Sequence, residues 1–136
     1  MLCTQTESKP HGSLVAFLFA KDMKSFYFAT PKETRKYRYL TQCDRVALVV
    51  DTRDKFPDDT SKIEAVTISG SAQEVGSGHA FNTLAKLYIK RHPNLEIFTD
   101  NKTMVFFRID VEQLTYVTEF QKVYYWTPRP VDEAIF

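Results

Sequence analysis

Strand-like segments dominate this chain, and their order limits the folds that it can adopt. About six or seven such segments and two helical ones alternate within 136 residues, and most neighbouring strands are close enough in sequence to form hairpins. A doubly wound parallel sheet does not fit, because each of its parallel strands is followed by a helix. The order therefore predicts a mainly antiparallel sheet, and so many strands in a short chain are expected to close into a small β-barrel.

Hydrophobic periodicity places these elements along the chain. The expected strands cover residues 2–5, 13–20, 25–29, 45–50, 63–75, 103–109 and 114–120, and residues 122–126 would extend the sheet. The expected helices cover residues 31–42 and 79–92. The apolar segment 13–20 is predicted to be buried on both faces, residues 7–12 to form a turn, and Gly70 to mark a bulge. No linker or internal repeat interrupts the pattern, so one domain is expected over residues 1–136.

The segment after the strand at 25–29 carries the signals that begin a helix. Thr30 can cap the helix, Pro31 suits its first position, and Glu33 completes a capping box. Residues 34–36 (Thr-Arg-Lys) would then lie within about two turns of the helix start, where unpaired N–H groups and the helix dipole attract anions. The segment therefore predicts a seat for a phosphate group, while a capped surface helix with solvated charges explains the same residues equally well.

Composition limits the partners and the chemistry. The net charge of +1 gives no electrostatic footprint for nucleic acid, and no apolar run approaches the roughly 20 residues that span a bilayer. Cys3 and Cys43 match neither a disulfide framework nor a zinc pattern, which fits a reducing, cytoplasmic setting. His11, His79 and His92 lack the spacing of metal ligands, so no metal site is expected.

Three stretches together resemble a known superfamily. They are residues 12–17 (GSLVAF), residues 27–30 (YFAT) followed by 34–37 (TRKY), and residues 45–53 (RVALVVDTR), and the strand-like run 65–70 (AVTISG) follows at the matching place. Their order and spacing are similar to those of the flavin-binding split-barrel superfamily, the pyridoxamine phosphate oxidase-like proteins. The resemblance covers roughly residues 1–126, and it rests on the combination of the stretches rather than on any one of them.

The resemblance implies a six-stranded antiparallel split β-barrel, a homodimer, and FMN bound at the interface between the two subunits. It implies that residues 13–15 lie along the isoalloxazine ring, largely through backbone groups. Arg35 and Lys36 would bind the phosphate. The planar guanidinium of arginine and the compact ammonium of lysine both suit a phosphate group. Asp51 and Arg53 would reach the ring or the other subunit. The cofactor-binding residues that the resemblance implies are Ser13, Leu14, Val15, Ala29, Thr30, Thr34, Arg35, Lys36, Asp51 and Arg53.

Two of these assignments have a purely structural alternative. Residues 13–17 would be apolar core in almost any barrel, and Asp51 with Arg53 would form a surface ion pair worth under about 1 kcal/mol. The chain also departs from the oxidases proper, because Ala65 stands where they place a glutamine and residues 129–136 lack their substrate signature. Oxidation of pyridoxamine phosphate itself is therefore not expected, whereas flavin binding is.

The leading hypothesis is an FMN-dependent oxidoreductase that acts on an unidentified small molecule. A flavin carries the hydride or electron chemistry itself, so no catalytic residue is predicted. A non-enzymatic module that stores or carries FMN, or that uses the cleft for haem or a deazaflavin, is the second hypothesis, and a barrel that serves as an interaction domain is the third. Tyr124, Tyr125 and Trp126 form an aromatic cluster that either walls the substrate side of the ring or packs at a strand end.

Overall fold

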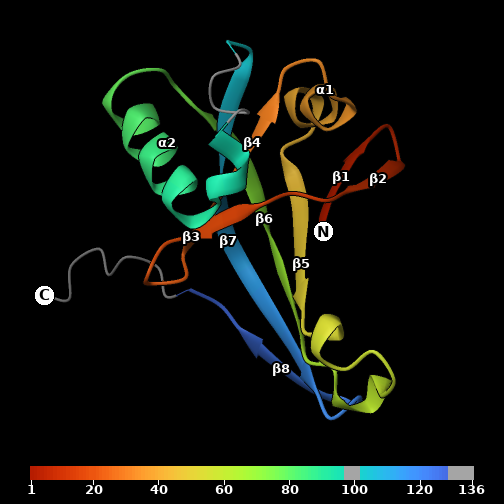
Figure 1. Cartoon of the computed structure of the whole chain (residues 1–136). Helices are drawn as coiled ribbons and strands as arrows, with labels where there is room; N and C mark the ends of the chain where they lie inside the picture. Colours follow the sequence, from red (N-terminus) through yellow and green to blue (C-terminus); the bar gives the residue numbers. More distant parts are fainter. Residues whose placement is uncertain (97–101, 129–136) are drawn as a thin grey trace, which may run out of the picture.

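Eight β-strands and two α-helices make up the computed structural model, which describes residues 1–96 and 102–128 (Figure 1). The strands form one sheet in the order β2-β1-β5-β6-β7-β4-β3, and β8 pairs with the far part of β7. Every pairing is antiparallel, which confirms the expected mainly β split barrel. The elements are β1 (Leu2–Thr6), β2 (Lys9–Ser13), β3 (Phe17–Phe19), β4 (Ser25–Pro31), α1 (Arg35–Gln42), β5 (Arg45–Asp51), β6 (Ala65–Val75), α2 (His79–Arg91), β7 (Met104–Thr118) and β8 (Lys122–Trp126).

The segment predicted as a turn, residues 7–12, contains most of a strand. Glu7 and Ser8 make the turn with positive φ angles of 47° and 63°, and the following residues form β2, which pairs with β1 as a hairpin. The prediction was wrong because two residues suffice for a tight hairpin. In addition, the sequence of β2, KPHGS, lacks the apolar alternation by which a strand is recognised.

The apolar run 13–20 is not one strand. β2 ends at Ser13 and β3 begins at Phe17, and these two strands lie at opposite ends of the sheet order. Figure 1 shows the chain passing across the sheet between them. The prediction of a strand buried on both faces was therefore wrong. The connecting residues 14–16, which we call the crossing loop, belong to no strand, and Leu14 is 87% exposed.

Helix α1 begins later than the capping signals indicate. The pairing of β4 with β7 continues through Thr30 and Pro31, so both residues remain in extended backbone. The actual N-cap is Thr34, whose hydroxyl accepts a hydrogen bond of 3.2 Å from the backbone N–H of Tyr37. Threonine at either position can cap a helix, but the ladder between β4 and β7 keeps Thr30 in the strand, so Thr34 takes this place.

Strand β7 is a single strand of 15 residues, where the sequence indicated two strands. Its register with β6 shifts between Ser69 and Gly70, which confirms the predicted bulge. Glu112 has no partner on β6 and is the extra residue of the bulge. The bulge lets β7 continue past the polar residues 112 and 113 without a break. A Cβ atom on residue 70 would lie 2.1 Å from the carbonyl oxygen of Asp110, and only glycine allows this approach.

The core lies between the inner faces of strands that are far apart in the sequence. Its fully buried side chains include Leu2, Phe28, Leu48, Ile68 and Ile109. Leu40 brings α1 into the same cluster. Helix α2 covers the outer face of β7 instead, where Phe81 and Tyr88 contact Phe106 edge-on.

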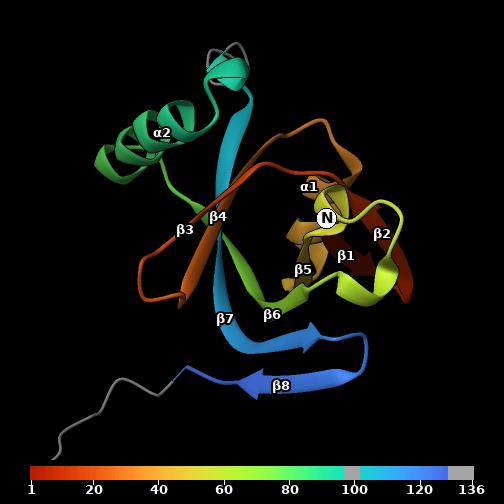
Figure 2. The ribbon, with the colours of Figure 1, turned by 60° about the horizontal axis from the view of Figure 1, so that its bottom comes forward.

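The end of β7 and strand β8 form a ribbon that stands away from both helices (Figure 2). Every residue of β8 is exposed, including Tyr124 (56%), Tyr125 (69%) and Trp126 (42%). Phe120, in the turn before β8, is 62% exposed. We call Phe120 and residues 123–126 the aromatic ribbon. So much exposed aromatic surface on one ribbon is typical of a site that contacts another molecule.

Candidate functional site

A pocket of about 190 Å³ lies where the crossing loop, the edge of β4 and the first turn of α1 meet. We call it the β4-edge pocket. Leu14, Val15, Ala29 and Lys36, all implied at the cofactor by the resemblance, line it. The other lining residues are Ala16, Pro31, Tyr88, Leu95 and Met104. The structure thus brings together residues from both the first and the second of the three resembling stretches.

The pocket exists because β3 is short. β3 pairs only with residues 26–28 of β4, so the next part of β4, Ala29 to Pro31, has no strand partner on that side among the described residues. The crossing loop runs near this edge without forming a ladder with it. An unpaired strand edge presents backbone N–H and C=O groups that a planar polar ligand can use. A ring system lying here would meet apolar side chains together with backbone hydrogen-bonding groups.

Lys36 supplies the charge of the pocket. Its side chain is partly buried on the first turn of α1, and this burial lowers the pKa of its ammonium from the ordinary value. Within residues 1–96 and 102–128, the ammonium has neither an ion-pair nor a hydrogen-bond partner. A cation that is desolvated without a partner is poised to accept an anion, because an anion would restore the lost interactions.

The other residues of the predicted phosphate seat have different surroundings. Arg35 is exposed at the start of α1, next to Lys36. The hydroxyls of Thr30 and Thr34 lie 2.8 Å apart, and the Thr34 hydroxyl also donates to the carbonyl of Pro31 at 3.0 Å. Thr30 is fully buried on the core side of β4. Both threonines therefore join the end of β4 to the start of α1 and hold Arg35 and Lys36 in position.

Ser13 lies at the end of β2, directly before the crossing loop. Its hydroxyl is buried and has no hydrogen-bond partner in the described part of the chain. A buried polar atom without a partner is uncommon in native proteins and calls for an explanation. Two polar groups near the crossing loop, the Ser13 hydroxyl and the Lys36 ammonium, thus form no hydrogen bond within the described residues.

Asp51 and Arg53 are not in the β4-edge pocket. They line a different cavity of about 310 Å³, together with Met1 and Phe17 among others. The Arg53 guanidinium binds the Asp51 carboxylate with Nη2 at 2.8 Å and Nε at 2.9 Å, and the Arg53 backbone N–H donates to it at 3.0 Å. These hydrogen bonds, the backbone one first, lower the pKa of the Asp51 carboxyl. Asp51 and Arg53 therefore neutralise each other's charge at the end of β5.

Tyr88, on α2, lines the pocket, and the sequence pattern did not identify it as a site residue. It is 3% exposed, and its burial raises the pKa of the phenol, which stays protonated. Its hydroxyl donates to the carbonyl of Ala16 in the crossing loop at 3.3 Å. Helical periodicity identifies Tyr88 as buried, but it carries no signal for a partner 72 residues earlier in the chain.

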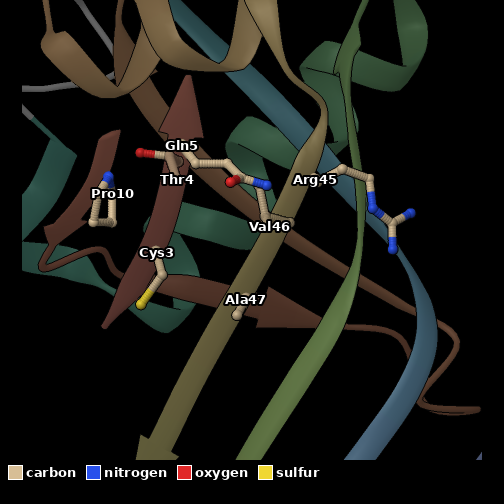
Figure 3. A pocket seen from close by; sticks show the side chains of 7 residues that line it. All are labelled: Cys3, Thr4, Gln5, Pro10, Arg45, Val46 and Ala47. Atoms are coloured by element: carbon tan, nitrogen blue, oxygen red, sulfur yellow. The ribbon is translucent and has the colours of Figure 1, made fainter. Parts of the chain in front are cut away.

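A larger cavity, of about 320 Å³, opens where β1 diverges from β5 beyond the paired residues Cys3 and Ala47 (Figure 3). Figure 3 shows the guanidinium of Arg45 pointing away from the other labelled side chains, and it forms a bidentate ion pair with Glu112. Cys3 and Cys43 are free thiols. No group of side chains in the described ranges could hold a metal ion. This cavity therefore gathers no charged group that lacks a partner.

Comparisons with known proteins agree on the family and the fold. A family model described as "Pyridoxamine 5'-phosphate oxidase" matches residues 1–118. A heme binding protein from Mycobacterium smegmatis aligns with a TM-score of 0.79 and 16% identity over 93% of this chain and 51% of its own length. HutZ, the heme storage protein from Vibrio cholerae, aligns with a TM-score of 0.72 and 13% identity over 90% and 82%.

A FAD-binding protein from Mesorhizobium loti aligns with a TM-score of 0.67 and 15% identity over 85% of this chain and 81% of its own. The chain therefore spans about half of the mycobacterial protein but most of the other two. No curated protein matches the sequence. Within the described residues, no helix is long and apolar enough to cross a membrane. The structural likenesses establish the split-barrel fold, and the family model, which covers most of the sequence, shows that this chain belongs to the pyridoxamine 5'-phosphate oxidase family.

Proposed function

We propose that this protein is an FMN-binding flavoprotein, and that it is an oxidoreductase acting on a small molecule, in a cytoplasmic setting. The observation that carries the proposal is the partly buried, unpaired ammonium of Lys36 at an apolar-walled pocket. In this proposal Arg35 and Lys36 hold the phosphate at the start of α1, where the helix dipole adds to their attraction. The similarity to a FAD-binding protein supports a flavin as the ligand.

The residues that line the pocket suit such a cofactor. Leu14, Val15 and Met104 offer apolar contact to the flat ring, and the unpaired edge of β4 offers backbone groups to its polar rim. Ser13, whose buried hydroxyl has no partner among the described residues, directly precedes the crossing loop but does not itself line the pocket. When bound, the flavin supplies hydride or electron transfer, while the protein binds and orients it. A deazaflavin has the same kind of phosphate-bearing tail and would use the same residues.

We further propose that two copies of the chain form the complete site. The β4-edge pocket, at about 190 Å³, is smaller than the roughly 300–1,000 Å³ typical of sites for ligands of this size. Part of the flavin would therefore lie outside the pocket of one chain, where a second chain can cover it. The aromatic ribbon gives each chain exposed apolar surface suited to such an interface. A monomer mass by light scattering would contradict this proposal.

The phosphate seat can be tested with one double substitution. We expect R35A/K36A to weaken FMN binding about 100-fold, because it removes two charge-assisted contacts, while far-ultraviolet circular dichroism and Tm stay near those of the wild type. The matched control is R38A, which removes an exposed cation from the same helix. Unchanged FMN affinity in the double variant would refute this assignment of the site. Oxidation of a reduced nicotinamide by the FMN-loaded protein would separate an enzyme from a carrier.

A haem-binding module is the second candidate, because two of the similar structures carry heme in their names. Haem iron is held by a protein side chain, which is a histidine in globins and peroxidases. However, His11, His79 and His92 do not line the β4-edge pocket. A hemin titration decides the matter: a Soret shift with one haem per site would favour this candidate, and no shift would leave flavin as the ligand. A folded protein that retains neither cofactor would instead be an interaction domain.

A further inference from the structure

Tyr88 of α2 and His92, the residue directly after α2, contact two consecutive carbonyl groups where the crossing loop meets β3. The hydroxyl of Tyr88 lies 3.3 Å from the carbonyl oxygen of Ala16, and Nε2 of His92 lies 3.0 Å from that of Phe17. Tyr88 and His92 are one helical turn apart, and their ring centroids are separated by 5.2 Å. Tyr88 near the end of α2 and His92 at its C-cap thus contact two neighbouring peptide groups more than 70 residues away in sequence.

The direction of both hydrogen bonds follows from chemistry. A carbonyl oxygen only accepts, so the phenol of Tyr88 donates and Nε2 of His92 carries the hydrogen in this contact. Burial raises the pKa of Tyr88, which keeps the phenol in its donating form. The ring of Tyr88 is also packed edge-on against Phe106 of β7, with centroids 5.5 Å apart. The hydroxyl is therefore aimed at the loop by a side chain whose orientation the barrel itself determines.

The crossing loop needs such support. Residues 14–16 lie between the end of β2 and the start of β3, and they belong to no strand. Val15 packs against the core, whereas Leu14 is 87% exposed, so packing holds only part of this loop. Because Leu14, Val15 and Ala16 all line the β4-edge pocket, the path of the loop determines the shape of that pocket.

We propose that Tyr88 and His92 form a clamp that positions the crossing loop as the wall of the β4-edge pocket, and that the clamp thereby sets the affinity and environment of the ligand bound there. His92 is a positioning residue that acts through the carbonyl of Phe17, whereas Tyr88 both lines the pocket and positions the carbonyl of Ala16. The identity of the ligand, FMN, rests on the proposed function, whereas the effect of the clamp on the loop does not. The clamp makes α2 part of the binding site although it is far from β2 and β3 in sequence.

Three variants test the clamp in the full-length protein. Y88F removes only the hydroxyl and keeps the packed ring, H92A removes the donor, and H92Q retains an N–H donor of similar reach. Y39F is the matched control, because Tyr39 lies on α1 and contacts His11 rather than the loop. Hydrogen–deuterium exchange of the segment 12–19 measures the loop without cofactor, and titration with FMN measures the pocket.

We expect Y88F and H92A each to accelerate exchange in the segment 12–19 and to weaken FMN binding about fivefold to tenfold, with a changed visible circular dichroism of the bound flavin. H92Q should restore most of the affinity lost in H92A, and Y39F should match the wild type. Wild-type exchange rates in both Y88F and H92A would overturn the clamp. Faster exchange with unchanged FMN affinity would overturn its role in binding. If the wild type binds no FMN, the proposed function fails, and the exchange rates alone decide whether the clamp exists.

Discussion

The centre of the sheet and the β4-edge pocket differ in packing and in the number of side chains that lack interaction partners. In the centre, β6 and β7 approach so closely that Gly70 has no room for a side chain, and Ile109 is fully buried. At the pocket, Lys36 has no ion pair within the described residues, and Leu14 is 87% exposed. Groups that lack partners lower stability and are retained where they serve a ligand. The centre therefore determines the fold, and the pocket edge is the binding site that we propose.

The largest expected effect comes from filling the close approach at the centre. G70A should lower the free energy of unfolding by about 3 kcal/mol, because its Cβ would meet the Asp110 carbonyl and force the two strands apart. Gly76 is the matched control, since no atom lies within 4 Å of a Cβ placed there. Urea denaturation of both variants measures the difference. Equal stability of G70A and G76A would show that the centre of the sheet accommodates a side chain at position 70, which would contradict the account.

The next effect separates function from stability at the pocket. K36M should weaken FMN binding at least tenfold, because it removes one charge-assisted contact to the phosphate. It should not lower the Tm of the cofactor-free protein, because the burial of an unpaired ammonium opposes folding. Isothermal titration and thermal denaturation measure the two quantities. A large loss of Tm would mean that Lys36 supports the fold after all.

The lowered pKa of Lys36 also predicts a pH dependence. Between that pKa and the higher value of the unfolded chain, the unfolded state binds more protons, so the stability of the cofactor-free protein rises with pH in this alkaline window. FMN affinity should fall over the same rise in pH, as the ammonium loses its proton. K36R keeps its charge throughout and should abolish the fall. The same alkaline loss of affinity in K36R would assign the titration to another group.

The smallest effect is expected at the ion pair of Asp51 and Arg53. R53A should cost under about 1 kcal/mol, because the guanidinium side chain is 67% exposed, and it should change FMN affinity less than about threefold. The low pKa of Asp51 means that the contribution of the pair is present above its ordinary pKa and is lost as the pH falls through the lowered value. A tenfold loss of FMN affinity in R53A would extend the site to this second cavity.

Much of the fold could be predicted from local pattern. The hairpin of β3 with β4, the position of β5, the Gly70 bulge and helix α2 follow from periodicity and from a glycine inside a strand, which are properties of neighbouring residues. The start of α1 could not be predicted in this way. Whether Thr30 or Thr34 caps the helix depends on the ladder of β4 with β7, which lies far away in the sequence.

The candidate site could be predicted from the sequence only in part. Arg35 and Lys36 stand in a recognisable motif, but nothing local distinguishes Lys36, which faces the pocket, from Arg35, which is exposed. Tyr88 contributes a hydroxyl through tertiary packing, and its spacing in α2 predicts burial alone. Asp51 and Arg53 line a separate cavity, and their contact with the cofactor stays a prediction.

The most direct test compares the binding of FMN with that of riboflavin, which has the same ring but no phosphate. Titration of the wild-type protein should give an affinity about 100-fold higher for FMN, and R35A/K36A should bind the two flavins equally weakly. That result would establish both the ring pocket and the phosphate seat at the start of α1. Equal affinity of the wild type for FMN and riboflavin would contradict the central claim that Arg35 and Lys36 bind a phosphate.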